Sequence, residues 1–133
     1  PMLNTSPSVP GAMPACIVAS REDHIVPWRS AYQCTRLSGG EATFVLGASG
    51  HIAGVVNPPT KNRRNYGTNP LPAATADDWL ARAETHPGSW WPHWGAWVAR
   101  HGGGSGPAPR AAGSAAQPPL YPAPGRYVLE TPE

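Results

Sequence analysis

The sequence predicts an α/β protein in which short parallel strands are connected by helices. Residues 15–19 (ACIVA) and 43–46 (TFVL) are short, continuous runs of apolar strand formers, as expected for strands buried on both faces of a parallel sheet. Residues 28–37 lie between these runs and can form a helix. The order strand, helix, strand is that of a βαβ unit, which places the two strands parallel in one sheet.

The helix expected at residues 28–37 has a start signal and a stop signal. Pro27 suits the first turn of a helix, because the N–H that proline lacks is not needed there. Gly39 and Gly40 follow the last apolar residue and end the helix. Beyond the second strand, residues 57–72 contain four prolines and are expected to form an extended surface loop.

Two further helices are expected in the second half of the chain. Thr75 is a suitable N-cap, and two aspartates follow it in the first turn, where carboxylates interact favourably with the helix dipole. Residues 86–88 (HPG) break this helix. Ser89 is expected to cap a second helix that ends at Gly102. This last helix is rich in tryptophan, with Trp90, Trp91, Trp94 and Trp97.

Composition divides the chain into four expected parts. Residues 1–14 are expected to be coil, and residues 15–101 to form the α/β part with the tryptophan-rich helical segment. Residues 102–119 are a flexible Gly/Pro/Ala/Ser linker, and residues 120–133 are a C-terminal tail. Proline and glycine account for 18 and 15 of the 133 residues. They are most frequent in these outer regions, so the core-forming part is shorter than the chain.

Charge and hydropathy exclude two classes of partner. The net charge is +2, and the densest basic patch, formed by Lys61, Arg63 and Arg64, has the character of a solvated loop. We therefore expect no nucleic acid as a partner. No run approaches the roughly 18 apolar residues that span a bilayer, and no signal peptide opens the chain. We expect no membrane span and a cytoplasmic location.

Asp23 and His51 are the candidate catalytic residues. Each follows a predicted buried strand, and ligands of open parallel sheets bind beyond the carboxyl ends of the strands. A neutral imidazole can take a proton from a nucleophile, while a carboxylate fixes its tautomer and stabilises the imidazolium. Asp before His is the chain order that an α/β-hydrolase shows after its nucleophile. The alternative is structural: Asp23 as a turn or capping residue, and His51 as a loop histidine.

The nucleophile of such a site is missing from the sequence. Neither Cys16 nor Cys34 has the Gly-x-Cys-x-Gly surroundings of a nucleophile elbow, and Ser49 lacks the required spacing. Both cysteines are interpreted as buried thiols. Two cysteines also make neither a disulfide framework nor a metal site, so we expect no metal. Because two strands do not form a stable sheet alone, and because the chain begins at Pro1, we expect a piece of a longer protein.

Five motifs together resemble the polyhydroxyalkanoate (PHA) synthases, from about Met13 to the end of the chain with the linker unmatched. The first two resemble the catalytic-Asp and catalytic-His motifs of that family. The others are shorter and occur in the same order. The motifs are residues 20–28 (SREDHIVPW), 44–54 (FVLGASGHIAG), 57–59 (NPP), 88–94 (GSWWPHW) and 122–128 (PAPGRYV).

The resemblance implies a fold and a reaction. It implies the C-terminal portion of an α/β-hydrolase fold from a class I-like enzyme that polymerises (R)-3-hydroxyacyl-CoA with release of CoA. In that family a cysteine upstream is acylated, His51 deprotonates it, and Asp23 acts on the 3-hydroxyl of the substrate. A role of Asp23 in orienting His51 is the rival assignment. His24 is a candidate supporting residue or a plain loop histidine. The chain alone is expected to be inactive.

The resemblance also implies the partners. The substrate is a CoA thioester and the product is a growing polyester. No cofactor is expected, and the family suggests a homodimer at the surface of polyester granules. Two alternatives remain open: an esterase or depolymerase of the same fold, and a non-catalytic module that binds polymer or a partner protein through its tryptophans. The tryptophan cluster is otherwise expected to pack against the sheet.

Overall fold

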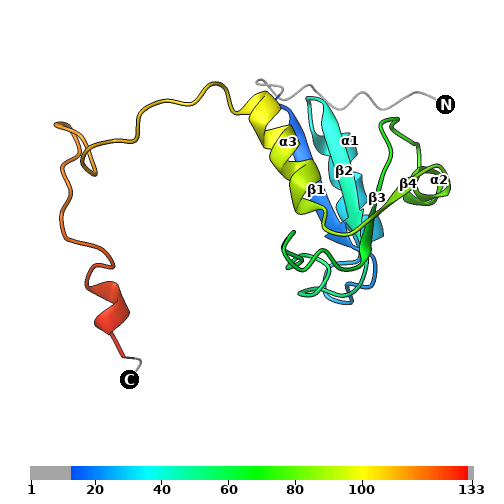
Figure 1. The fold of residues 1–133 in the computed structure, drawn as a ribbon, viewed down its shortest axis with the longest axis horizontal. Helices are drawn as coiled ribbons and strands as arrows, with labels where there is room; N and C mark the ends of the chain where they lie inside the picture. Colours follow the sequence, from blue (N-terminus) through cyan, green and yellow to red (C-terminus); the bar gives the residue numbers. More distant parts are fainter. Residues whose placement is uncertain (1–12, 132–133) are drawn as a thin grey trace. The chain divides into compact units, whose positions relative to one another are not determined.

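The computed structural model describes residues 13–131, so most of the coil expected for residues 1–14 lies outside the described residues. The chain divides into two compact units between Gly103 and Gly104. Of the described elements, the four strands and the three α-helices all belong to the first unit (Figure 1).

The first unit is built on one four-stranded sheet with the order β1-β2-β3-β4. Strands β1 (Ala15–Ser20) and β2 (Ala42–Gly47) are parallel, with Ile17 opposite Phe44. This confirms both predicted strands and their parallel pairing. Strands β3 (Asn65–Thr68) and β4 (Glu84–Pro87) add to β2 as antiparallel neighbours, so the sheet is mixed.

Two predictions about the region after β2 were wrong. Residues 57–72, expected to be only a loop, contain β3, and the expected break at residues 86–88 overlaps β4. Each of these strands has only four residues, too few for a periodic signal in the sequence. They exist because β2 offers β3 an edge with unpaired backbone groups, and β3 in turn offers one to β4.

The helix predictions were largely correct. Helix α1 spans Trp28–Leu37, as expected, and buries Trp28 and Tyr32. Helix α2 spans Ala76–Ala81, and the Thr75 hydroxyl accepts the Asp78 N–H at 3.0 Å, which confirms the N-cap. The helix ends earlier than the break expected at residues 86–88. Helix α3 spans Trp91–His101.

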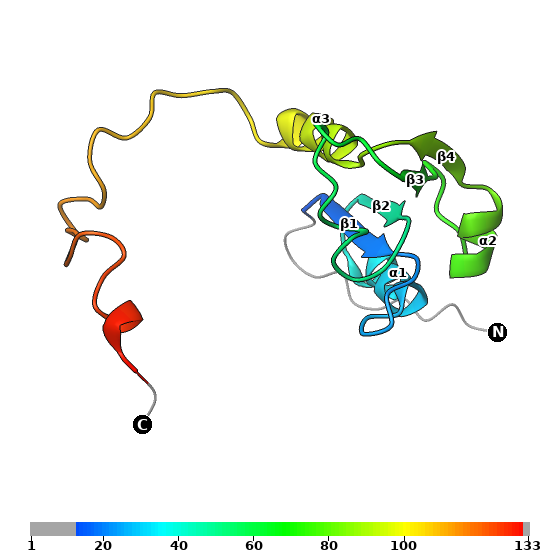
Figure 2. The same ribbon diagram turned by 60° about the horizontal axis from the view of Figure 1, so that its bottom comes forward.

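The start of α3 differs slightly from the expected one, because Trp90 holds the formal N-cap position. The Ser89 hydroxyl nevertheless accepts the Trp91 N–H at 3.2 Å. The predicted end of the helix is confirmed by Gly102 at the C-cap. Figure 2 shows α1 and α3 on opposite sides of the sheet.

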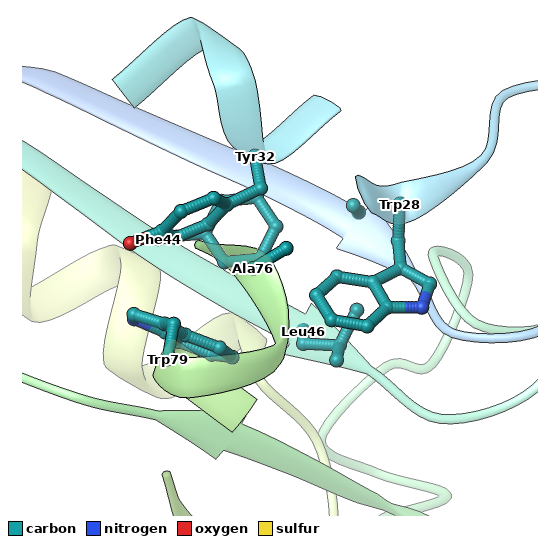
Figure 3. Close-up of a cluster of buried hydrophobic side chains, with 7 residues drawn as sticks. Trp28, Tyr32, Phe44, Leu46, Ala76 and Trp79 are labelled. Atoms are coloured by element: carbon teal, nitrogen blue, oxygen red, sulfur yellow. The ribbon is translucent and has the colours of Figure 1, made fainter. Parts of the chain in front are cut away.

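An aromatic core joins α1, α2 and the sheet (Figure 3). The Phe44 ring meets the Tyr32 ring edge-on at 5.1 Å and the Trp79 ring edge-on at 5.0 Å between centroids. Trp79 is only 2% exposed, so Trp79→Ala would cost about 3–5 kcal/mol of stability. The Tyr32 hydroxyl donates to the Ala73 carbonyl at 3.0 Å, which fixes the loop before α2. The core therefore makes β1, β2 and α1 a firm base for the loops at their ends.

The second unit contains one short 3₁₀ helix, Tyr127–Leu129, in otherwise irregular chain. The Arg126 guanidinium lies 4.4 Å from the centre of the Tyr121 ring, a cation–π contact. Across residues 13–131, no helix combines the length and apolar character needed to cross a membrane.

Candidate active site

Two loops at the carboxyl ends of β1 and β2 carry the candidate catalytic residues. The Arg21 N–H donates to the Gly47 carbonyl at 2.8 Å, and the Glu22 N–H donates to the Ser49 carbonyl at 3.0 Å. These bonds extend the contact between the two strands beyond their last ladder pair. They bring the loop that carries Asp23 against the loop that carries His51.

The structure brings Asp23 and His51 together, as the sequence predicted. Asp23 Oδ2 lies 2.7 Å from His51 Nδ1. The other carboxylate oxygen, Oδ1, accepts the backbone N–H groups of Ile25 and Val26, each at 2.9 Å. The Asp23 side chain is only 8% exposed, whereas that of His51 is 46% exposed. The carboxylate is thus enclosed and the imidazole is accessible.

These contacts determine the charge state of Asp23. The Val26 N–H and then the hydrogen bond to His51 are the main causes that lower the pKa of Asp23 to about 2. Asp23 is therefore a carboxylate, an acceptor only, and the 2.7 Å contact requires a proton on His51 Nδ1. In the neutral imidazole this leaves Nε2 with its lone pair, the arrangement of a general base.

The turn that carries His51 is compact and strained at one residue. Ser49 has φ of 77°, in the left-handed region that non-glycine residues rarely adopt. The Gly54 N–H donates back to the Gly50 carbonyl at 2.8 Å, which closes one helical turn around His51. A Cβ on Gly54 would lie 2.3 Å from Ser20 Oγ, so this position requires glycine.

A hollow of about 450 Å³ opens beside the pair and is mostly apolar. Ser20 lines this hollow, and its hydroxyl is buried without a hydrogen-bond partner among the described residues. The first strand was expected to end at residue 19, but Ser20 is the last residue of β1 and is 2% exposed. The lining residues are Val18, Ala19, Ser20, Asp23, Val26, Ala31, His51, Ile52, Val55 and Val56.

The structure does not bring either cysteine to the pair. Cys16 is near the start of β1, four residues before Ser20, which separates it from the carboxyl end by roughly 13 Å at about 3.3 Å per residue. Burial raises the pKa of the Cys16 thiol. Cys34 is on α1 and exposed, so its interpretation as a buried thiol was wrong. His24, although beside Asp23 in sequence, makes no hydrogen bond within residues 13–131.

The fold and the site define a mixed α/β segment with a His–carboxylate pair at the carboxyl ends of two parallel strands. Comparison with known proteins identifies its relatives. The chain is 53% identical over 116 residues to the poly(3-hydroxyalkanoate) polymerase subunit PhaC of Cupriavidus necator, which covers 87% of this chain and 20% of that protein. It is 43% identical over 118 residues to the subunit PhaC of Rhizobium etli, covering 89% of this chain and 18% of that protein.

A third relative is a polymerase with a different name, from another organism. Poly(3-hydroxyalkanoate) polymerase 2 of Ectopseudomonas oleovorans is 45% identical over 115 residues, covering 84% of this chain and 20% of that protein. No family model matches the chain. The chain is therefore a homologue of a segment of the poly(3-hydroxyalkanoate) polymerases, and it spans about a fifth of the length of the relatives it matches.

Proposed function

We propose that this chain supplies the acid–base pair of a polyhydroxyalkanoate synthase, within the C-terminal portion of an α/β-hydrolase-type catalytic domain. The observation that carries the proposal is the 2.7 Å contact between His51 Nδ1 and Asp23 Oδ2 at the carboxyl ends of β1 and β2. The similarity to poly(3-hydroxyalkanoate) polymerases supports the assignment of the reaction. The proposed substrate is (R)-3-hydroxyacyl-CoA, and no cofactor is required.

The nucleophile in this proposal is a cysteine outside the 133 residues. His51 Nε2 takes the thiol proton, and the thiolate attacks the thioester carbonyl of the substrate. The bond from the acyl carbon to the CoA sulfur breaks, and CoA leaves as the thiol with that proton. His51 then takes the proton of a 3-hydroxyl group, whose oxygen attacks the acyl-cysteine. An ester bond forms, the bond from the acyl carbon to the cysteine sulfur breaks, and the cysteine regains a proton.

In this mechanism Asp23 orients His51 and stabilises the imidazolium. Two features of Asp23 support this role over direct deprotonation of the 3-hydroxyl. Both of its oxygens already accept hydrogen bonds. Its pKa of about 2 also makes it a weak base, whereas general-base catalysis is most efficient when the pKa is near the working pH.

The experiment that tests the proposed function replaces His51 by Gln in the polymerase chain that contains this sequence. CoA release from (R)-3-hydroxybutyryl-CoA and polymer formation are both measured. We expect His51→Gln to abolish both, because each half-reaction needs the same base. The matched control is His101→Gln, on the exposed end of α3, which should retain activity. Release of CoA by His51→Gln at the rate of the unmodified enzyme would reject the proposed function.

The wider setting is part of the same proposal and rests on the relationship to the polymerases. We propose that the whole protein acts in the cytoplasm at the polyester granule surface and as a homodimer. An esterase or depolymerase would release free hydroxy acid from preformed polyester. A polymerase extends the polyester from the CoA thioester, so measuring both products distinguishes the two activities.

A further inference from the structure

Segment 88–91, which connects β4 to the first residue of α3, holds the loop that follows His51. The Trp90 indole N–H donates to the Gly54 carbonyl at 3.2 Å, and the Trp91 indole N–H donates to the Val55 carbonyl at 2.9 Å. The Ser89 hydroxyl donates to the Asn57 carbonyl. Three consecutive side chains thus bind three carbonyl groups within four residues of the loop, 32 to 36 positions away in sequence.

We propose that Trp90 and Trp91 are positioning residues for His51: their indole N–H groups fix the turn that carries the imidazole. This inference rests on the proposed function of His51 as the general base. It differs from plain packing of the tryptophans, because it assigns the effect to two hydrogen bonds rather than to the apolar area of the rings.

The loop needs such an anchor because several of its apolar side chains are not buried. Ile52 is 72% exposed and Val56 is 60% exposed, so little apolar burial ties this part of the chain to the core. The turn is closed internally by the bond from the Gly54 N–H to the Gly50 carbonyl. Among the described residues, the Gly54 carbonyl accepts only the Trp90 indole N–H, whereas the Val55 carbonyl also accepts the Asn57 N–H at 3.1 Å. The two indole donors link these carbonyls to another part of the chain.

The anchoring segment is itself fixed to the sheet. It follows β4 directly, and the Gly88 N–H donates to the Arg64 carbonyl at 2.8 Å. The Ser89 N–H donates to the Asn62 side-chain oxygen at 2.9 Å. Gly88 has φ of +87°, and a Cβ there would lie 2.2 Å from Asn62 Oδ1, so the close approach requires glycine. The two indoles therefore extend from the start of α3, at a point where the chain is fixed beside the sheet.

Indole is well suited to this role. Its N–H is a donor only and does not titrate in the working pH range, so the contact is the same whether His51 is neutral or protonated. Trp90 is 9% exposed, and its ring meets the Trp94 ring edge-on at 6.3 Å, which limits its freedom to rotate. The position of the turn, and with it that of His51 Nε2, then stays constant through the catalytic cycle.

The test uses Trp90→Phe and Trp91→Phe in the polymerase chain that contains this sequence, because phenylalanine keeps an aromatic ring and removes the donor. Trp97→Phe is the matched control, since the Trp97 ring lies against His101 and its indole N–H has no hydrogen-bond partner within residues 13–131. Rapid-quench measurement of CoA release from (R)-3-hydroxybutyryl-CoA gives the burst amplitude and the rate constant separately. Hydrogen exchange of the peptide covering residues 50–57 reports the order of the loop.

We expect each donor variant to lower the first-turnover rate constant about tenfold, because a small misplacement of a catalytic group is enough for such a loss. Exchange in residues 50–57 should become faster, and Trp97→Phe should change neither quantity. A loss confined to burst amplitude would mean fewer folded molecules and would reject the positioning role. An unchanged rate constant would also reject it, whatever the exchange result. Full activity of His51→Gln would instead refute the proposed function, a separate outcome.

Discussion

Replacing Asp23 by Asn tests how the carboxylate serves the imidazole. In the structure Oδ1 accepts two backbone N–H groups and Oδ2 faces His51 Nδ1 at 2.7 Å. Asparagine can keep its oxygen on the backbone N–H groups, which places its NH₂ group toward Nδ1. Two donors cannot face each other at that distance, so Nδ1 must become the acceptor. The proton then moves to Nε2, and the base loses its lone pair.

The size of the effect follows from this change of tautomer. In a Ser-His-Asp triad, the corresponding Asp-to-Asn change lowers the rate about 10⁴-fold, which corresponds to roughly 5.5 kcal/mol in the activation barrier. We expect the first-turnover release of CoA to fall by a similar factor in Asp23→Asn. Asp77→Asn, an exposed aspartate on α2 paired with Arg29, is the matched control and should retain the burst.

Rapid-quench measurement of CoA release with the polymerase chain that contains this sequence checks the expectation. If Asp23 mainly activates the 3-hydroxyl, the first acylation does not need it. Asp23→Asn would then show a near-normal burst followed by slow elongation. Such a burst, within about tenfold of the unmodified enzyme, would refute the orienting role.

Three other predictions follow from the site. The 133-residue chain by itself should release no CoA from (R)-3-hydroxybutyryl-CoA above the no-protein background, because neither cysteine lies at the pair; release above it would contradict this. Gly54→Ala should lower CoA release about tenfold, since its Cβ would lie 2.8 Å from the Ala48 carbonyl and closer still to Ser20 Oγ. Gly95→Ala on α3, with no atom near its Cβ, should leave release unchanged. Asp23 should produce no acid limb in the kcat/KM profile between pH 4 and 9. The lowered pKa keeps the Asp23 carboxylate charged above pH 3.8, and it becomes protonated only as the pH falls toward about 2. An acid limb in this pH range that disappears in Asp23→Asn would disprove the prediction.

The sequence allowed much of the site to be predicted. Strands β1 and β2 are continuous apolar runs, and such runs indicate buried strands without any tertiary information. Once their parallel pairing is inferred, the convergence of Asp23 and His51 follows, because carboxyl ends of adjacent parallel strands meet at one edge. The Thr75 cap and the extent of α1 were predicted from equally local signals.

Tertiary structure alone decided the features that support the site. Strands β3 and β4 form through pairing with a neighbouring edge, and their four-residue sequences are too short to indicate it. The burial of Ser20 depends on the close approach of Gly54. The indole of Trp90 finds its acceptor 36 residues away. Local sequence determines conformational preference and apolar periodicity, whereas these hydrogen bonds and contacts depend on which distant backbone groups the folded chain brings within reach.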